Sequence, residues 1–161
     1  MMKSDDPVVV LGYARTPVGS FGKSLAKVPA HVLGATAAKA ALERSGVSAA
    51  DIDEWIIGCV GSTGTDAYIS RRVSIEAGAA VESTAMTVNR LCGSAMQAIG
   101  LAAQELMVGE SDLVVAGGTE NMSAQPFLDF SARAGVTLGD ELLMDVFDRT
   151  YIQTSCRLHS D

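Results

Sequence analysis

Thr87 to Gly100 reads TVNRLCGSAMQAIG, and this stretch contains the junction on which the fold depends. The run 84–89 is short and apolar, which is typical of a strand, whereas the alanine- and methionine-rich run from Gly93 is typical of a helix. Cys92 lies where the two runs meet. The stretch therefore predicts a strand that passes directly into a helix, with a thiol at the start of the helix.

Short apolar strands and helices also alternate on both sides of this junction. The predicted strands span residues 7–14, 54–61, 84–89 and 112–118, and the predicted helices span residues 31–44, 66–78 and 93–109. Such alternation is typical of proteins in which right-handed crossovers join parallel strands. We therefore predict an α/β fold with a mostly parallel sheet.

The helix predicted over residues 93–109 is apolar over most of its surface. Its polar side chains fall on one narrow stripe, which consists of Ser94, Gln97, Gln104 and Glu105. One face of a sheet can cover only half of such a helix. We therefore expect either a further packed layer on its other side or an exposed apolar surface that favours self-association.

The composition excludes several classes of function. The 161 residues carry a formal net charge of -7, and no block of Lys and Arg offsets it, which argues against nucleic acid as a partner. No run of 18 apolar residues is present, so no membrane span is expected. The three cysteines are widely spaced, which indicates free thiols in a reducing compartment, and we expect a cytoplasmic location.

Cys92 has two interpretations from the residues alone. A free cysteine is usually a small buried residue. At the start of a helix, however, unpaired N–H groups and the helix dipole stabilise a thiolate, which makes the thiol reactive. Gly93 and Ser94 are small enough to let a ligand approach. From the residues alone, a structural role and a nucleophilic role for Cys92 are therefore about equally supported.

Two glycine-containing segments match nucleotide-binding motifs only in part. Phe21–Ser24 reads FGKS, but Pro17 stands where a phosphate-binding loop needs glycine. Ala116–Asn121 reads AGGTEN, which is not G-x-G-x-x-G, so a nicotinamide cofactor has little support. We interpret the latter as a tight turn in which Gly117 and Gly118 let the backbone approach another group.

Several polar residues are weaker candidates. We expect His31 at the surface or as a helix cap, and Arg71 and Arg72 on a solvated helix face. Cys156 and His159 are too few to bind a metal ion, so no metal site is expected.

Residues 87–123, TVNRLCGSAMQAIGLAAQELMVGESDLVVAGGTENMS, closely resemble the nucleophile region of thiolases, the acyl-CoA C-acyltransferases. Three other segments resemble that family in the same order: ARTPVGSFGKSLAKVPAHVLGA (14–35), ALERSGVSAADIDEWIIGCV (41–60) and ARAGVTLGDELLMD (132–145). The resemblance covers about residues 7–145. The related ketoacyl synthases share the fold, but the segments around Cys92 are similar to those of thiolases.

The resemblance implies a thiolase-like layered αβα fold. On this basis we expect the incomplete N-terminal core domain over residues 1–118 and the beginning of the loop domain over residues 119–161. It also implies that Cys92 is the acyl-accepting nucleophile and that its backbone N–H helps to hold the thioester oxygen. Turn and packing positions near the site are expected at Gly93, Ser94, Gly117, Gly118, Asn121 and Met122.

The implied reaction proceeds through a thioester on Cys92. The acyl group then passes to acetyl-CoA in a Claisen condensation or to coenzyme A in thiolysis. No bound cofactor is expected, because the coenzyme A thioester is the substrate. The expected partners are acyl-CoA and coenzyme A, together with a homo-oligomer or another association through exposed apolar surface.

The sequence also departs from the thiolase family. The Asn-containing, Gly-His-Pro and Cys-x-Gly motifs of the second half of thiolases are absent, and these supply an oxyanion partner and the acid/base groups. His159 has no Gly-His-Pro context, and Cys156 is not followed by x-Gly. Ala67 and Tyr68 replace a Gln-Asn pair that many thiolases have. We therefore expect an N-terminal half that is inactive as an isolated chain.

Two other classes of function remain open. The chain could be a short non-catalytic thiolase-like protein that binds a partner subunit through its sheet edge and apolar helix face. It could also be a thiol redox protein, although Cys92 has no second cysteine in C-x-x-C spacing.

Overall fold

A three-stranded parallel sheet forms the centre of the molecule, in the order β2-β1-β3. The structure is a computed structural model that describes all residues except 1–6, 136–137, 141 and 147–161. The central strand β1 spans Glu54–Gly58, and it pairs with β2, Thr84–Val88, and with β3, Val114–Gly118. The predicted α/β fold with parallel strands is confirmed.

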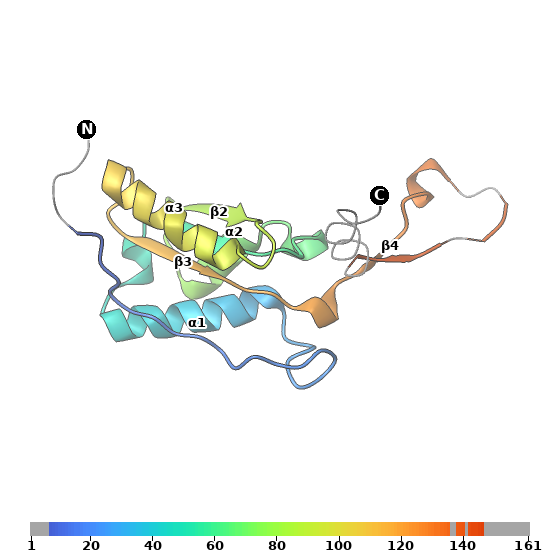
Figure 1. The fold of residues 1–161 in the computed structure, drawn as a ribbon, viewed down its shortest axis with the longest axis horizontal. Helices are drawn as coiled ribbons and strands as arrows, with labels where there is room; N and C mark the ends of the chain where they lie inside the picture. Colours follow the sequence, from blue (N-terminus) through green and yellow to red (C-terminus); the bar gives the residue numbers. More distant parts are fainter. Residues whose placement is uncertain (1–6, 136–137, 141, 147–161) are drawn as a thin grey trace, which may run out of the picture.

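Helices cover both faces of this sheet (Figure 1). They are α1 (Ala30–Ser45), α2 (Ile69–Ala77) and α3 (Ser94–Val108). Trp55 and Ile57 pack with α1 and α2 on one face, whereas Ile56 packs with α3 on the other. Because successive side chains of a strand point to opposite faces, β1 contributes to both apolar layers.

The outer face of α3 is exposed in the part of the chain that the structure describes. Its large apolar side chains are open to solvent: Met96 is 79% exposed, Met107 58%, Ile99 56% and Val108 51%. The sheet therefore covers only the inner side of this helix, as the narrow polar stripe predicts. Exposed apolar side chains that gather on one helix are often found at protein interfaces.

The prediction of a strand over residues 7–14 is wrong. Residues 7–20 belong to no described strand, and Val9 and Val10 are exposed. The segment runs along α1 (Figure 1), where Arg44 donates a hydrogen bond of 2.7 Å to the backbone oxygen of Tyr13. Its β-branched residues favour an extended backbone, but a strand also needs a partner edge, and no described strand pairs with it.

Beyond Gly118 the chain forms short elements that the sequence pattern does not indicate. Strands β4 (Phe127–Leu128) and β5 (Met144–Asp145) pair antiparallel and lie away from the three-layered part (Figure 1). The boundary expected after residue 118 stays a prediction. Among the described residues, no helix has the length and apolarity that crossing a membrane requires.

Three basic side chains have other surroundings than the sequence suggests. Arg71 donates to the backbone oxygen of Ser83 at 2.8 Å, and Arg72 donates to that of Thr65 at 2.8 Å. Both arginines therefore fasten loops instead of lying on a solvated face. His31 is partly buried, and its Nε2 lies 3.2 Å from Nη2 of Arg72.

The surroundings of His31 lead to a prediction about how the stability of the fold depends on pH. Burial, followed by the positive charge of Arg72, lowers the pKa of His31 from its ordinary 6.5. The unfolded chain therefore takes up a proton at a higher pH than the folded chain does. We expect the free energy of unfolding to fall as the pH decreases through 6.5.

The measurement is chemical denaturation at a series of pH values, for the native chain and for His31→Asn. The variant should lose this part of the pH dependence. If both chains respond equally to pH, the contribution of His31 is absent.

Candidate functional site

Cys92 is exposed in the turn between β2 and α3. Helix α3 begins at Ser94 and has Gly93 as its N-cap, so Cys92 lies just before the helix and not in its first turn. An exposed thiol in such a turn is accessible to a ligand from solvent. The backbone conformation of this turn therefore determines the position of the thiol as much as the helix does.

The turn that carries Cys92 contains an unusual backbone conformation. Leu91 has a φ of 49°, and it is the only described residue other than glycine with positive φ. This left-handed conformation costs about 1–2 kcal/mol for a residue with a Cβ atom. Hydrogen bonds oppose that cost: the Leu91 N–H donates to Asn89 Oδ1 at 3.1 Å, and the Leu91 carbonyl accepts from Ser94 Oγ at 2.6 Å.

Ser94, the first residue of α3, stabilises the turn by hydrogen bonds. Its buried hydroxyl also accepts a hydrogen bond of 2.8 Å from the N–H of Arg90. The small side chain expected to leave room for a ligand thus also holds the residues on both sides of Leu91.

The backbone N–H groups around Cys92 differ in their partners. Those of Gly93 and Ser94 donate to the carbonyls of Arg90 and Leu91 at 3.1 Å and 3.0 Å. The N–H of Cys92 donates to no acceptor within the described residues. An N–H group beside the thiol is therefore available to an oxygen atom of a ligand.

Two glycines form the surface on which the first turn of α3 rests. Gly58 and Gly118 are partners in the β1–β3 pairing. A Cβ atom on Gly58 would lie 2.5 Å from the carbonyl carbon of Ser94, and one on Gly118 would lie 2.7 Å from Cβ of Ala95. Only glycine lets the helix approach this closely, which positions the turn before it.

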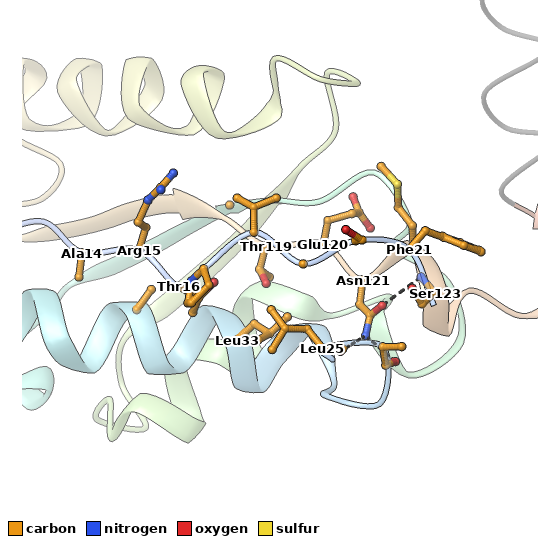
Figure 2. Close-up of a pocket in the computed structure, with 18 residues that line it drawn as sticks. Ala14, Arg15, Thr16, Phe21, Leu25, Leu33, Thr119, Glu120, Asn121 and Ser123 are labelled. Atoms are coloured by element: carbon orange, nitrogen blue, oxygen red, sulfur yellow. Dashed lines mark hydrogen bonds between the residues drawn. The ribbon is translucent and has the colours of Figure 1, made fainter. Parts of the chain in front are cut away.

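Three further residues expected near the site have other surroundings than Gly58 and Gly118. A Cβ atom on Gly117 would meet nothing within 4 Å, so this glycine is not required by packing. Asn121 is buried and donates from Nδ2 to the carbonyls of Ala26 and Val28 at 3.0 Å and 2.7 Å. It fastens the loop before α1 and not the Cys92 turn (Figure 2). Met122 is 41% exposed and lines a separate cavity.

That cavity has a volume of about 420 Å³ and lies between residues 14–21, α1 and residues 118–123 (Figure 2). Arg15 and Glu120 are the charged groups in its lining, which is otherwise uncharged. Cys92 does not contribute to it. The cavity and the exposed thiol are therefore separate features.

Glu120 connects the end of β3 to the loop that follows β1. Its carboxylate accepts hydrogen bonds from the N–H groups of Val60 and Gly61 at 2.8 Å and 3.1 Å, and Sγ of Cys59 lies 3.6 Å away. Burial, followed by the negative charge of Glu120, raises the pKa of Cys59 to about 12. Cys59 thus remains a protonated, unreactive thiol.

The contrast between the two described thiols is testable by alkylation. Iodoacetamide at about pH 8 should label Cys92 in the native chain and leave Cys59 unlabelled, because only a thiolate reacts and Cys59 is buried. Peptide mapping by mass spectrometry measures the label at each position. In denaturant both cysteines should react, which is the control. Equal labelling of both in the native chain would contradict the assignment.

The described residues do not complete a catalytic centre around Cys92. No described side chain forms a hydrogen bond with its thiol. No described group of three His, Cys, Asp or Glu residues could hold a metal ion. Cys156 and His159 lie outside the described residues. The site therefore provides a nucleophile and an N–H donor, but no base in the described part of the chain.

Comparisons with known proteins found a matching family model and similar proteins. Residues 8–156 match the family model described as thiolase, N-terminal domain. An acetyl-CoA acetyltransferase of Cupriavidus necator is 47% identical over 138 residues, which are 86% of this chain and 35% of that protein. An acetyl-CoA acetyltransferase of Syntrophomonas wolfei is 45% identical over 128 residues, which are 80% of this chain and 32% of that protein.

A solved structure is similar as well. It is the crystal structure of Acat5 thiolase from Ascaris suum in complex with coenzyme A, with a TM-score of 0.81 and 36% sequence identity. The match covers 87% of this chain and 36% of that one. This chain thus spans about a third of the length of the curated relatives that it matches.

Proposed function

Because the chain belongs to the thiolase family, we propose that Cys92 is the acyl-accepting nucleophile of an acyl-CoA C-acyltransferase reaction. The observation that carries this proposal is the exposed thiol beside a backbone N–H that has no acceptor among the described residues, directly before α3. A thiolase reaction needs these two groups at one place, because charge develops on the carbonyl oxygen when sulfur attacks.

In the proposed first step, Sγ of Cys92 attacks the carbonyl carbon of a coenzyme A thioester. The carbon–sulfur bond to coenzyme A breaks with its electron pair, and a new thioester forms on Cys92. The thiol proton passes to the departing coenzyme A sulfur through solvent or through a base outside the described residues. One thioester replaces another, so the step needs no energy source, and the N–H of Cys92 holds the carbonyl oxygen.

In the second step, the acyl group leaves Cys92. In a Claisen condensation it passes to the carbanion of acetyl-CoA. In thiolysis Cys92 is acylated by a different bond cleavage: Sγ attacks the 3-keto carbon of a 3-ketoacyl-CoA, the bond between C2 and C3 breaks, and the acetyl-CoA carbanion that leaves takes up a proton. The acyl group then passes from Cys92 to the thiol of coenzyme A. Coenzyme A and acyl-CoA are therefore the proposed small-molecule partners. The coenzyme A in the Ascaris suum thiolase structure supports this assignment.

Two further parts of the proposal concern the state of the chain. We propose a cytoplasmic location, because Cys59 and Cys92 are free thiols and a reducing compartment keeps them so. We also propose association through the exposed apolar face of α3, either between copies or with another chain.

The experiment that tests the proposal is the intact mass of the 161-residue chain before and after incubation with acetoacetyl-CoA, with peptide mapping of the product. We expect one acylation event without turnover. Cleavage between C2 and C3 of acetoacetyl-CoA should leave one acetyl group on the peptide that contains Cys92, and the reaction should stop there because the acid/base motifs of the family's second half are absent from this sequence. Absence of an adduct on Cys92, or an equal adduct on Cys59, would contradict the proposal.

A second candidate function is a non-catalytic binding subunit, and the exposed face of α3 favours it. In that case the chain would form a stable complex without any acyl group on Cys92. A redox function receives less support, because Cys59 is buried and stays protonated.

A further inference from the structure

We propose that Glu120 is a positioning residue for Cys92, and that it acts through the loop after β1 and the side chain of Asn89. The inference rests on the proposed function of Cys92. It assigns to Glu120 and Asn89 the task of holding the turn that presents the thiol and its N–H.

The first link is the carboxylate of Glu120. Oε2 accepts from the N–H of Val60 at 2.8 Å, and Oε1 accepts from that of Gly61 at 3.1 Å. A charged acceptor makes shorter and stronger hydrogen bonds than a neutral one. Glu120 thus fixes two consecutive peptide groups of the loop after β1.

The second link is the side-chain amide of Asn89, which uses both of its ends. Nδ2 donates to the carbonyl of Val60 at 3.3 Å, and Oδ1 accepts from the N–H of Leu91 at 3.1 Å. An amide can donate on one side and accept on the other, so the Asn89 side chain joins the carbonyl of Val60 to the N–H of Leu91. The orientation of Val60 therefore sets the orientation of Asn89.

The third link is the strained residue beside the nucleophile. Leu91 has a positive φ, and the hydrogen bond from its N–H to Asn89 is one of the contacts, together with those from Ser94, that oppose relaxation towards the more favourable negative region. Such a rotation would reorient both the thiol and the N–H of the next residue, Cys92. A fixed backbone conformation at Leu91 therefore also fixes the orientation of the Cys92 thiol and of its N–H, the two groups that the proposed reaction uses.

The order of these links follows the order of the strands. Glu120 comes just after β3, Val60 after β1 and Asn89 after β2, and the sheet order is β2-β1-β3. The carboxyl ends of parallel strands lie at one edge of a sheet. The hydrogen-bonded relay therefore crosses the whole sheet at this edge, from β3 to the turn that contains Cys92.

A double-mutant cycle on the 161-residue chain tests the relay. Glu120→Gln keeps the size of the side chain and removes its charge, whereas Asn89→Ala removes the second link. Glu76→Gln is the matched control, because this carboxylate lies on α2 and forms an exposed ion pair of 3.6 Å with Lys39. The first measurement is hydrogen exchange of the Leu91 amide. The second is the rate of Cys92 acylation at saturating acetoacetyl-CoA.

We expect Glu120→Gln and Asn89→Ala each to accelerate exchange at Leu91 by about fivefold, the effect of one ordinary hydrogen bond. Acylation should slow by about tenfold or more, with an unchanged half-saturating concentration, because a displaced reacting atom lowers the rate of the chemical step. The double variant should equal Asn89→Ala alone, since both changes interrupt one relay. The control should match the native chain.

Effects that multiply in the double variant, or an unchanged Leu91 amide in Glu120→Gln, would overturn the relay. Amides of α1 report whether each variant is folded, and Glu120→Asp, which keeps the charge but is shorter, repeats the test if Glu120→Gln unfolds. If native Cys92 takes up no acetyl group, the proposed function fails, and the exchange cycle alone decides the relay. If native Cys92 is acetylated and the effects multiply, the proposed function stands and the relay fails.

Discussion

Replacement of Cys92 by serine is expected to abolish acyl transfer to the chain, with a fall in the acylation rate of about three orders of magnitude or more. A serine hydroxyl is a much weaker nucleophile than a thiol unless an adjacent base activates it. The described residues place no hydrogen-bonding side chain on the Cys92 sulfur, so the substituted hydroxyl would have no such help. Mass spectrometry after incubation with acetoacetyl-CoA measures the effect.

The matched control is Cys59→Ser. Cys59 is buried after β1 and remains protonated, so its replacement should leave the adduct on Cys92. An acetyl group mapped to a different peptide in Cys92→Ser would place the nucleophile at another residue. Loss of it in Cys59→Ser, with the fold intact by circular dichroism, would show that the buried thiol takes part.

The second large effect is expected for Gly58→Val and Gly118→Val. A Cβ atom on Gly58 would lie 2.5 Å from the backbone of α3, far below the ordinary contact distance of about 3.5–4.0 Å between carbon atoms. Backbone cannot rotate away as a side chain can, so the helix must shift. Overpacking of this kind costs about 1–3 kcal/mol or more. We expect a lower midpoint of chemical denaturation and loss of Cys92 acylation.

The control for this prediction is the neighbouring Gly117→Ala. A Cβ atom there meets nothing within 4 Å, so both the denaturation midpoint and the acylation should stay close to those of the native chain. If Gly58→Val retained the native stability and acylation, α3 would not need its close approach to β1. Equal damage in Gly117→Ala would point instead to a general intolerance of β3.

The junction in residues 87–100 could be interpreted from sequence because it combines two local signals. The run before Asn89 is short and apolar, whereas the run after Gly93 is long and rich in helix-forming residues. Such signals depend only on neighbours in the chain. The same reasoning fails for residues 7–14, because extended backbone becomes a strand only beside a partner edge, and nothing local reveals that partner.

The residues of the site show the same difference between signals that are local in the sequence and contacts that form only on folding. Cys92 could be identified because a strand-to-helix junction and a family resemblance both mark it. Gly58 carried a weaker signal, since glycine within a strand often permits a close approach. Asn89 and Glu120 carried none, because their contacts join the ends of different strands and exist only in the folded chain.

The position of β1 between two strands that follow it in the chain has a consequence for synthesis. On the ribosome, β1 emerges before β2 and β3, so both of its edges stay unpaired while the rest is made. Helix α1 precedes it and can cover Trp55 early, but Ile56 must wait for α3. The nascent chain thus passes through a stage with an apolar strand open on both edges, which makes it prone to aggregation. We therefore expect slower translation to lengthen this exposed stage, and a chaperone that binds extended apolar segments to reduce aggregation before α3 and β3 arrive.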